Sequence, residues 1–305
     1  WYVRSCRRRF VPVGTKENGG SCPQKGARRV AIYHCSIKVI SRGKGKSAVA
    51  AAAYRAGEKI TNQFDGMTHD YTHKGGVVHT EILLPDHAPA EYADRAVLWN
   101  EVEKIEKAKN AQLAREIEIS LPRELTREQS ISLVREYVKR HFVAAGMCAD
   151  VCLHDTGGGN PHAHIMLTMR PFDEGGEWGA KQKKEYILDR DGNKIYDPKK
   201  RQYKCKSIPA TDWNEQTKAE EWRAAWARLC NQTLEQYEHA ERIDHRSYER
   251  QGINQIPTVH LGVAASAMEK RGIRTGRGDL NREIEVTNQK LRPLKARISK
   301  TRQKC

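Results

Sequence analysis

The sequence predicts an α+β fold in which a central antiparallel sheet carries helices on one face and is followed by a helical C-terminal extension. Short segments in which apolar and polar residues alternate are typical of strands with one face in a core. Two such segments, 148–154 and 162–169, are separated only by the turn-rich sequence DTGGGNP, which favours an antiparallel hairpin. Longer amphipathic segments between the other strands predict the helices that cover the sheet.

Composition limits the class of protein. The chain has 305 residues and a mass of 34.7 kDa; 38% of the residues are hydrophobic, 30% are charged, and the mean hydropathy is −0.78. No apolar run approaches the ~18–20 residues of a membrane-spanning helix, and no secretory signal pattern occurs, so no membrane segment is expected. The eight cysteines include no CxxC motif, which favours reduced thiols and a cytoplasmic location.

Charge and periodicity divide the chain into three parts. Residues 1–29 are rich in Arg and Gly without any period, so we expect an extension that is disordered or foreign to the domain. Residues 30–258 form the predicted main domain, and residues 259–305 form a basic helical extension that we expect to be truncated. The net charge of +16 lies mostly in the two terminal parts, so binding of a polyanion in the main domain must use local basic clusters.

Capping residues mark two of the predicted helices. Ser47 precedes the small-residue helix 48–56, and Gly57 follows it. Thr126 precedes an amphipathic helix that extends to about residue 145. The other predicted elements are strands at 30–40, 81–85 and 112–120, a helix at 90–108, a hairpin around 191–193, and helices at 213–239, 259–273 and 276–305.

Three histidines form the clearest chemical pattern. His162 and His164 lie two residues apart on a predicted strand, so they share a face. In a hairpin closed by residues 155–161, His154 lies opposite His162, and the three imidazoles point the same way. This arrangement suits a divalent metal with positions open to a substrate, although surface histidines of a hairpin would show the same spacing.

Two carboxylates occupy one face of another predicted strand. Glu116 and Glu118 alternate with Ile117 and Ile119 in REIEISLP. If their face is the histidine face, either carboxylate could orient a metal-bound imidazole or accept a proton. Otherwise they are solvated side chains.

Tyr54 is the one large side chain on the alanine-rich helix 48–56, which follows the basic loop 41–46. The loop is no P-loop, because Ile40 stands where the first glycine of that motif would be. The helix N-terminus after Ser47 could receive a phosphate with the help of Lys44 and Lys46, or the loop could simply be solvated. Taken alone, the position of Tyr54 favours a core-packing residue.

Four motifs together resemble the MobA/MobL family of plasmid mobilisation relaxases, which belong to the HUH endonucleases. The similarity covers about residues 30–290, and the four motifs occur in the family's order. They are VAIYHCSIKVISRGKGKSAVAAAAYRAGE, REIEISLP, CLHDTGGGNPHAHIMLTMRP and RIDHRSYERQGI. Because family members typically begin near Val30, the resemblance also implies that residues 1–29 come from the choice of gene start. The fold it implies is the palm of the HUH relaxases.

The resemblance implies a metal-dependent nicking reaction. Single-stranded DNA at a plasmid transfer origin is cut by transesterification, which leaves a 5′-phosphotyrosine link and a 3′-hydroxyl. Tyr54 is the implied nucleophile, with Tyr248 as second choice, and Glu116 or Glu118 would accept the proton. The implied ligands of a Mg²⁺ or Mn²⁺ ion are His154, His162 and His164. The implied DNA contacts are Arg42, Lys44, Lys46, Arg55, His245, Arg246 and Tyr248.

The resemblance also implies partners and a place of action: auxiliary mobilisation proteins, the coupling protein of a type IV secretion system, and the bacterial cytoplasm. Two other functions stay open. A rolling-circle replication initiator shares the chemistry, but its tyrosine helix typically follows the histidine strand, whereas Tyr54 precedes it. A non-enzymatic DNA-binding module with structural zinc would need a fourth ligand, for which only Cys152 or Asp155 is at hand.

Overall fold

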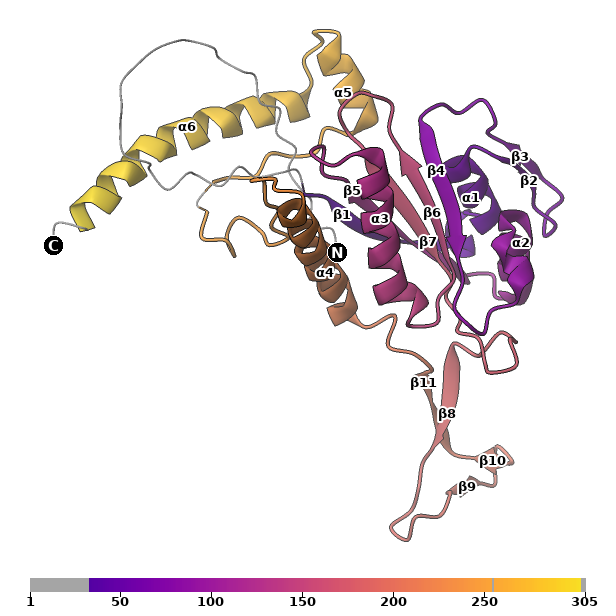
Figure 1. Cartoon of the computed structure of the whole chain (residues 1–305). Coiled ribbons are helices and arrows are strands. Elements are labelled where there is room, and N and C mark those ends of the chain that lie inside the picture. Colours follow the sequence, from indigo (N-terminus) through magenta and orange to yellow (C-terminus); the bar gives the residue numbers. More distant parts are fainter. Residues whose placement is uncertain (1–32, 254, 303–305) are drawn as a thin grey trace. The chain divides into compact units, whose positions relative to one another are not determined.

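The computed structural model describes residues 33–253 and 255–302 (Figure 1). The extension expected at residues 1–29 therefore lies outside the described residues. The chain divides into two compact units: Ile37–Leu229 forms one, and the described residues up to Ser36 and from Cys230 onward belong to the other. The predicted domain boundary at residue 258 stays a prediction.

A five-stranded sheet is the centre of the first unit, in the order β1-β5-β7-β6-β4. The pairs β5–β7, β7–β6 and β6–β4 are antiparallel, which confirms the predicted α+β class. The sheet extends the hairpin of β6 and β7 by one strand on one side and two on the other (Figure 1). The strands are β1 (Cys35–Ser41), β4 (Val77–Leu83), β5 (Gln112–Ser120), β6 (Ala149–His154) and β7 (His162–Leu167).

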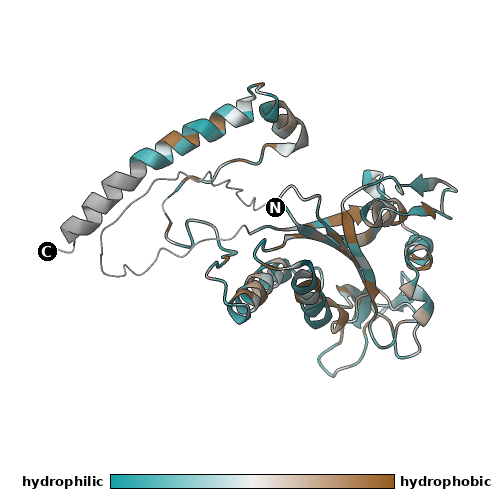
Figure 2. Cartoon of the chain, turned by 45° about the horizontal axis from the view of Figure 1, so that its top comes forward, coloured by the Kyte–Doolittle hydropathy of each residue, from teal (hydrophilic) through white to brown (hydrophobic). Residues whose placement is uncertain are grey.

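Helices lie on both faces of the sheet, whereas the sequence predicts them on one face only (Figures 1 and 2). α3 (Arg127–Val138) lies on one side, and α1 (Ala48–Ala56) and α2 (Arg95–Ile105) lie on the other. The face of the sheet that carries the histidines is polar at one end only, because β7 presents Met166 on that face as well as His164. A second layer of helices can therefore pack against its apolar end. Met166 belongs to the hydrophobic core formed with α1 and α2.

The predicted caps of α1 and α3 are confirmed. The Ser47 hydroxyl accepts the backbone N–H of Ala50 at 3.1 Å, and Gly57 ends α1 with a φ of 69°. Thr126 forms a capping box with Gln129 at the start of α3. Beyond Gly57 the chain forms a hairpin of β2 (Lys59–Thr61) and β3 (Thr68–Asp70), which packs beside α1 (Figure 1).

The segment after β7 forms a long, exposed hairpin arm (Figure 1). Its strands are β8 (Gln182–Tyr186), β9 (Tyr196–Asp197), β10 (Gln202–Tyr203) and β11 (Cys205–Pro209), and they pair as β8–β11 and β9–β10. The predicted turn around residues 191–193 is confirmed, since Leu188 bridges Lys194 across it. Lysines and arginines dominate the charged residues of the arm.

The helical C-terminal extension is also confirmed. α4 (Gln216–Gln236) leads into the second unit, which contains α5 (Gly262–Lys270) and α6 (Gly276–Arg302). The buried Asn288 of α6 holds the preceding loop, because its amide pairs with the backbone N–H and C=O of Ile256 at 2.9 Å each. No helix in the described part of the chain is long and apolar enough to cross a membrane.

A buried ionic cluster fixes α2 to the sheet beneath the histidines. The carboxylate of Asp150 on β6 accepts two hydrogen bonds from Arg95, both at 2.9 Å, and one from the Trp99 indole at 2.8 Å. Arg95 also pairs with Glu58, which follows the C-cap residue Gly57 of α1. Because Asp150 lies on the same strand face as Cys152 and His154, this cluster sets where α2 meets the histidine strand.

The substitution Asp150→Asn is expected to lower the free energy of unfolding by about 3–5 kcal/mol, because it removes the buried carboxylate partner of Arg95 and leaves only the more exposed Glu58. Urea unfolding followed by circular dichroism measures the change. Glu101→Gln is the matched control, since it breaks only the more exposed Glu101–Lys104 pair of α2 and should cost less than about 0.5 kcal/mol. Equal effects of the two substitutions would contradict the structural role of Asp150.

Candidate active site

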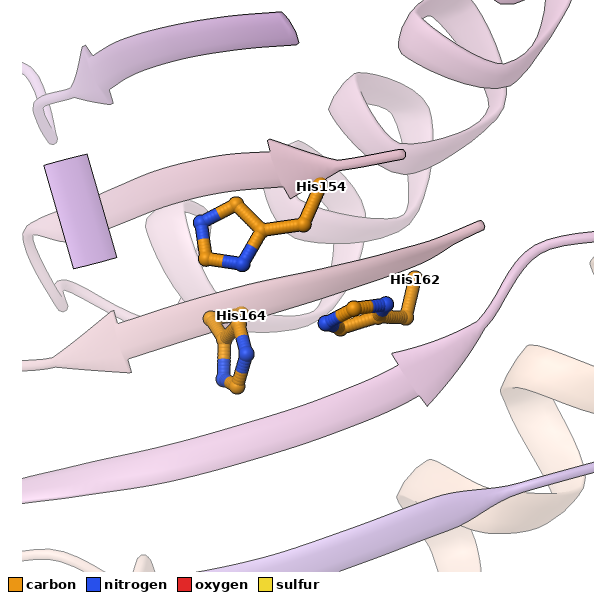
Figure 3. A group of neighbouring side chains, drawn as sticks. All are labelled: His154, His162 and His164. Atoms are coloured by element: carbon orange, nitrogen blue, oxygen red, sulfur yellow. The ribbon is translucent and has the colours of Figure 1, made fainter. Parts of the chain in front are cut away.

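The three histidines converge on one face of the sheet (Figure 3). His154 ends β6, and it pairs in register with His162 at the start of β7, so the predicted juxtaposition is confirmed. The ring centroids are 4.9–5.3 Å apart. One nitrogen atom from each imidazole lies within 4.8 Å of the others, and within the described residues this is the group that could hold a metal ion.

Each imidazole also contacts an oxygen atom outside the group. His154 Nε2 lies 2.6 Å from the Arg55 carbonyl, His162 Nδ1 lies 2.9 Å from the Asn160 carbonyl, and His164 Nδ1 lies 2.9 Å from Glu116 Oε1. Carbonyl and carboxylate oxygens only accept, so these nitrogens act as donors and the other nitrogen of each ring is the one that can bind a metal ion. Three imidazoles oriented in this way fit a divalent metal ion.

The pKa of His154 favours the uncharged imidazole. The pKa of His154 is lowered to about 4, mainly by burial and to a smaller extent by the nearby Lys74 and the two other histidines. The hydrogen bond to the Arg55 carbonyl opposes this shift but does not cancel it. At neutral pH His154 is therefore uncharged, as a metal ligand must be.

Glu116 and Glu118 lie on the histidine face, since Glu118 pairs in register with His164. Glu116 is buried, and burial opposes its ionisation, but His164 and Arg55 outweigh this and lower the pKa of Glu116 to about 2. Arg55 Nε donates to Glu116 Oε1 at 2.7 Å. Glu118 has a different environment: its side chain is more exposed and pairs with Lys38 Nζ at 2.9 Å.

Tyr54 is no core residue, because 49% of it is exposed on α1. Its ring meets the Tyr71 ring edge-on at a centroid distance of 5.2 Å. Lys74 Nζ lies 4.1 Å from the centroid of the Tyr54 ring and donates to the Tyr54 carbonyl at 2.7 Å. Burial is the main cause that lowers the pKa of Lys74. No sequence pattern marks Tyr71 or Lys74, which belong to a segment without periodicity.

Arg55 connects the tyrosine helix to the histidines in two ways. Its backbone carbonyl contacts His154, and its guanidinium pairs with the carboxylate that holds His164. The guanidinium also donates to the Ala51 carbonyl at 2.7 Å, which keeps it against α1. The side chain is 14% exposed, so the structure gives this predicted DNA contact a partner inside the protein.

The basic loop before α1 is only partly available for phosphates. Arg42 donates to Glu103 Oε2 at 2.8 Å and to backbone carbonyls near the end of α2, whereas Lys44 and Lys46 are exposed. Glu103 Oε1 accepts the Ala48 N–H at 2.7 Å. This buried carboxylate occupies the N-terminus of α1, so the phosphate considered for that position would meet a negative charge instead.

The residues suggested as a fourth zinc ligand have other roles. Asp155 Oδ1 accepts the Gly157 N–H at 2.8 Å, so it caps the turn after β6. The Cys152 thiol is buried, and burial raises its pKa, which disfavours the thiolate that zinc requires. Neither residue belongs to the metal-binding group found among the described residues.

His245, Arg246 and Tyr248 belong to the second unit. Arg246 pairs with Asp244 at 2.7 Å, and this hydrogen bond is the main cause that lowers the pKa of Asp244. The Tyr248 carbonyl accepts the Ile253 N–H at 2.8 Å within the same turn. The DNA contacts expected at these residues stay predictions.

Comparison with known proteins relates this geometry to a family. The profile of the MobA/MobL family matches residues 46–271. The chain is 37% identical over 286 residues to the "Probable mobilization protein MobA" of Bifidobacterium longum, a match that covers 89% of this chain and 50% of that protein. It is 40% identical to the "Mobilization protein MobL" of Acidithiobacillus ferridurans, with 79% of this chain and 65% of that protein covered. The chain thus spans about half to two thirds of these relatives.

A longer relative and a solved structure agree with these matches. The "Conjugal transfer protein TraA" of Agrobacterium fabrum is 40% identical over 86% of this chain, which corresponds to 24% of that protein. A solved structure described as "Molecular Basis of Vancomycin Resistance Transfer in Staphylococcus aureus" has 33% identity and a TM-score of 0.61, and covers 72% of this chain and 100% of that one. On the match to most of its length, this chain belongs to the MobA/MobL family.

Proposed function

We propose that this chain is the DNA-nicking relaxase part of a plasmid mobilisation protein, which cuts one strand of single-stranded DNA at a transfer origin. The observation that carries the proposal is the double connection of Arg55, the neighbour of Tyr54, to His154 and to the Glu116–His164 pair. Arg55 thereby connects the half-exposed phenol of Tyr54 to a group of histidines that is suited to a metal ion. The names of the relatives supply the biological setting, mobilisation and conjugal transfer.

His154, His162 and His164 would hold a divalent ion, Mg²⁺ or Mn²⁺ in the cell. When bound, such an ion neutralises negative charge on the non-bridging oxygens of the scissile phosphate. Mn²⁺ suits imidazole ligands better than Mg²⁺, which prefers oxygen. Glu116 and the Arg55 carbonyl orient two of the imidazoles, and the sheet holds all three on adjacent strands.

In the proposed reaction the Tyr54 hydroxyl oxygen attacks the phosphorus. The bond from phosphorus to the 3′ oxygen breaks, and this oxygen leaves as a 3′-hydroxyl with a proton. The phosphate stays on the 5′ end of the other fragment, now joined to Tyr54. Since one phosphodiester replaces another, the strand can be rejoined without ATP. Lys74, whose ammonium lies over the Tyr54 ring, is placed to favour the negative charge of the attacking oxygen.

The two carboxylates take different parts in this proposal. A phenol is mostly protonated at neutral pH and needs a base. Glu116, with a pKa of about 2, is a weak base, so we assign it the positioning of His164 and Arg55. Glu118, more exposed and on the same face, is the better candidate for proton acceptance. The order of Tyr54 before the histidines favours a relaxase over a replication initiator.

The proposed partners are single-stranded DNA at the transfer origin, auxiliary mobilisation proteins and a type IV secretion coupling protein, and the proposed place of action is the bacterial cytoplasm. The exposed lysines of the loop before α1 and the basic arm of β8–β11 support a polyanionic partner. The relatives named for conjugal transfer come from bacteria, which supports this setting.

The substitution Tyr54→Phe is expected to lower the cleavage rate at least about 1000-fold, because no nucleophilic oxygen remains. The assay uses a labelled single-stranded oligonucleotide from the transfer origin of the plasmid that encodes the chain, with Mn²⁺, on a denaturing gel. The unaltered chain should give a shortened oligonucleotide and a covalent protein–DNA band, and EDTA should remove both. Tyr237→Phe, which alters an exposed tyrosine outside the proposed site, is the matched control and should cleave normally; a band that survives Tyr54→Phe but not Tyr248→Phe would overturn the assignment.

The substitutions Glu116→Gln and Glu118→Gln should separate positioning from proton transfer. Glu116→Gln removes the charge that holds His164 and Arg55, so the dissociation constant for Mn²⁺ should rise roughly 10- to 100-fold. Glu118→Gln should leave Mn²⁺ binding unchanged and slow the cleavage. Calorimetric titration with MnCl₂ and the gel assay measure the two effects, and the opposite pattern would contradict the division of roles between the two carboxylates.

A further inference from the structure

The turn between β2 and β3 carries two large apolar side chains in solvent. Phe64 and Met67 are each 59% exposed, the highest fraction among the large hydrophobic residues of 33–253. Single exposed apolar residues are common, but two on one short turn beside a nucleophile helix form a small patch that calls for a functional explanation. We call Phe64 and Met67 the turn patch.

The backbone of this turn is firmly held. Asn62 N–H donates to the Met67 carbonyl at 2.8 Å, and the Gly66 N–H donates to the Asn62 carbonyl at 2.8 Å. The buried Asn100 of α2 accepts the Gln63 N–H at 2.8 Å and donates to the backbone of β2. The turn patch is therefore presented on a rigid support, which lowers the entropic cost of binding a ligand.

Phe64 already stacks against a planar cation. The guanidinium of Arg42 lies 4.2 Å from the centroid of the Phe64 ring, and Glu103 and the end of α2 hold that guanidinium in place. Since more than half of Phe64 remains exposed, a second planar group can contact the ring. Lys44 and Lys46, in the same loop as Arg42, are exposed as well.

We propose that the turn patch is a stacking site for bases of single-stranded DNA, with Lys44 and Lys46 contacting the neighbouring phosphates; this rests on the relaxase function proposed above. An exposed aromatic ring next to lysines is the combination that binds single strands without sequence preference. Asp65, the carboxylate of the turn, accepts the Met67 N–H at 2.9 Å, so it serves the backbone of the turn.

The turn patch lies on the route to the nucleophile. Asn62 Nδ2 donates to the Ser47 hydroxyl at 3.3 Å, which fixes the turn to the start of α1. Tyr54 follows seven residues later on the same helix, about 10 Å along its axis at 1.5 Å per residue. A base stacked on Phe64 would thus lie a few nucleotides from the phosphate that reaches Tyr54.

The test is the affinity for fluorescein-labelled oligo(dT)20, measured by fluorescence anisotropy at several salt concentrations in the Tyr54→Phe background with EDTA, so that no cleavage occurs. Phe64→Ala should weaken binding roughly 5- to 100-fold, with an unchanged slope of log affinity against log salt, because stacking releases no counterions. Lys44→Ala and Lys46→Ala should each weaken binding and reduce that slope by about 0.7. Phe64→Trp should retain the affinity.

Tyr237→Ala, which removes an exposed aromatic residue of the other unit, is the matched control, and thermal unfolding verifies that each variant is folded. Normal oligo(dT)20 binding by Phe64→Ala would overturn the proposal, and a protein partner would then have to explain the exposed patch. The outcome is separate from that of the cleavage assay. If Phe64→Ala weakens binding but the unaltered chain does not cleave DNA, the stacking site is retained and the relaxase function is refuted. If the unaltered chain cleaves DNA and Phe64→Ala binds normally, the relaxase function is retained and the stacking site is refuted.

Discussion

The carboxylate of Glu116 is the interaction on which the candidate site depends. It accepts hydrogen bonds from Arg55 and from His164, so one buried anion ties the helix that carries Tyr54 to the strand that carries His164. The Arg55 carbonyl adds the contact to His154. A buried carboxylate is costly without partners, so Arg55 and His164 cannot move away from Glu116 independently of each other. These contacts fix the spacing between the helix of Tyr54 and the histidines.

The packing of the first unit serves this arrangement. The histidine face of the sheet is apolar at one end, where the alanines of α1 let the helix approach closely, and polar at the other, where α1 ends beside the histidines. Asp150 fixes α2 to the histidine strand through Arg95 and Trp99, and Glu103 of α2 in turn caps α1 and holds Arg42. Buried charged residues therefore connect the sheet to α2, and α2 to the helix that carries Tyr54.

Local patterns predicted much of this structure. A period of two with a glycine-rich turn was enough to place His154 opposite His162, and capping chemistry was enough to delimit α1. Pairings between distant residues were beyond such rules: Arg55 and Glu116 are 61 residues apart, and nothing in either segment marks them as partners. The position of Lys74 over the Tyr54 ring was not predictable either, because Lys74 lies in an irregular segment. The second helical layer was not predicted because the charged residues that alternate along the strands gave no sign that the histidine face is apolar at one end.

The coupling of the tyrosine helix to the histidines through Arg55 is tested most directly by Mn²⁺ titration of an Arg55→Gln variant. The uncharged side chain leaves Glu116 without its cation while the backbone contact to His154 can persist. Mn²⁺ affinity and cleavage rate should both fall by about tenfold or more, and Arg55→Lys should recover part of each. A variant that binds Mn²⁺ as tightly as the unaltered chain and cleaves the transfer-origin oligonucleotide at the same rate would show that the helix and the histidines act independently.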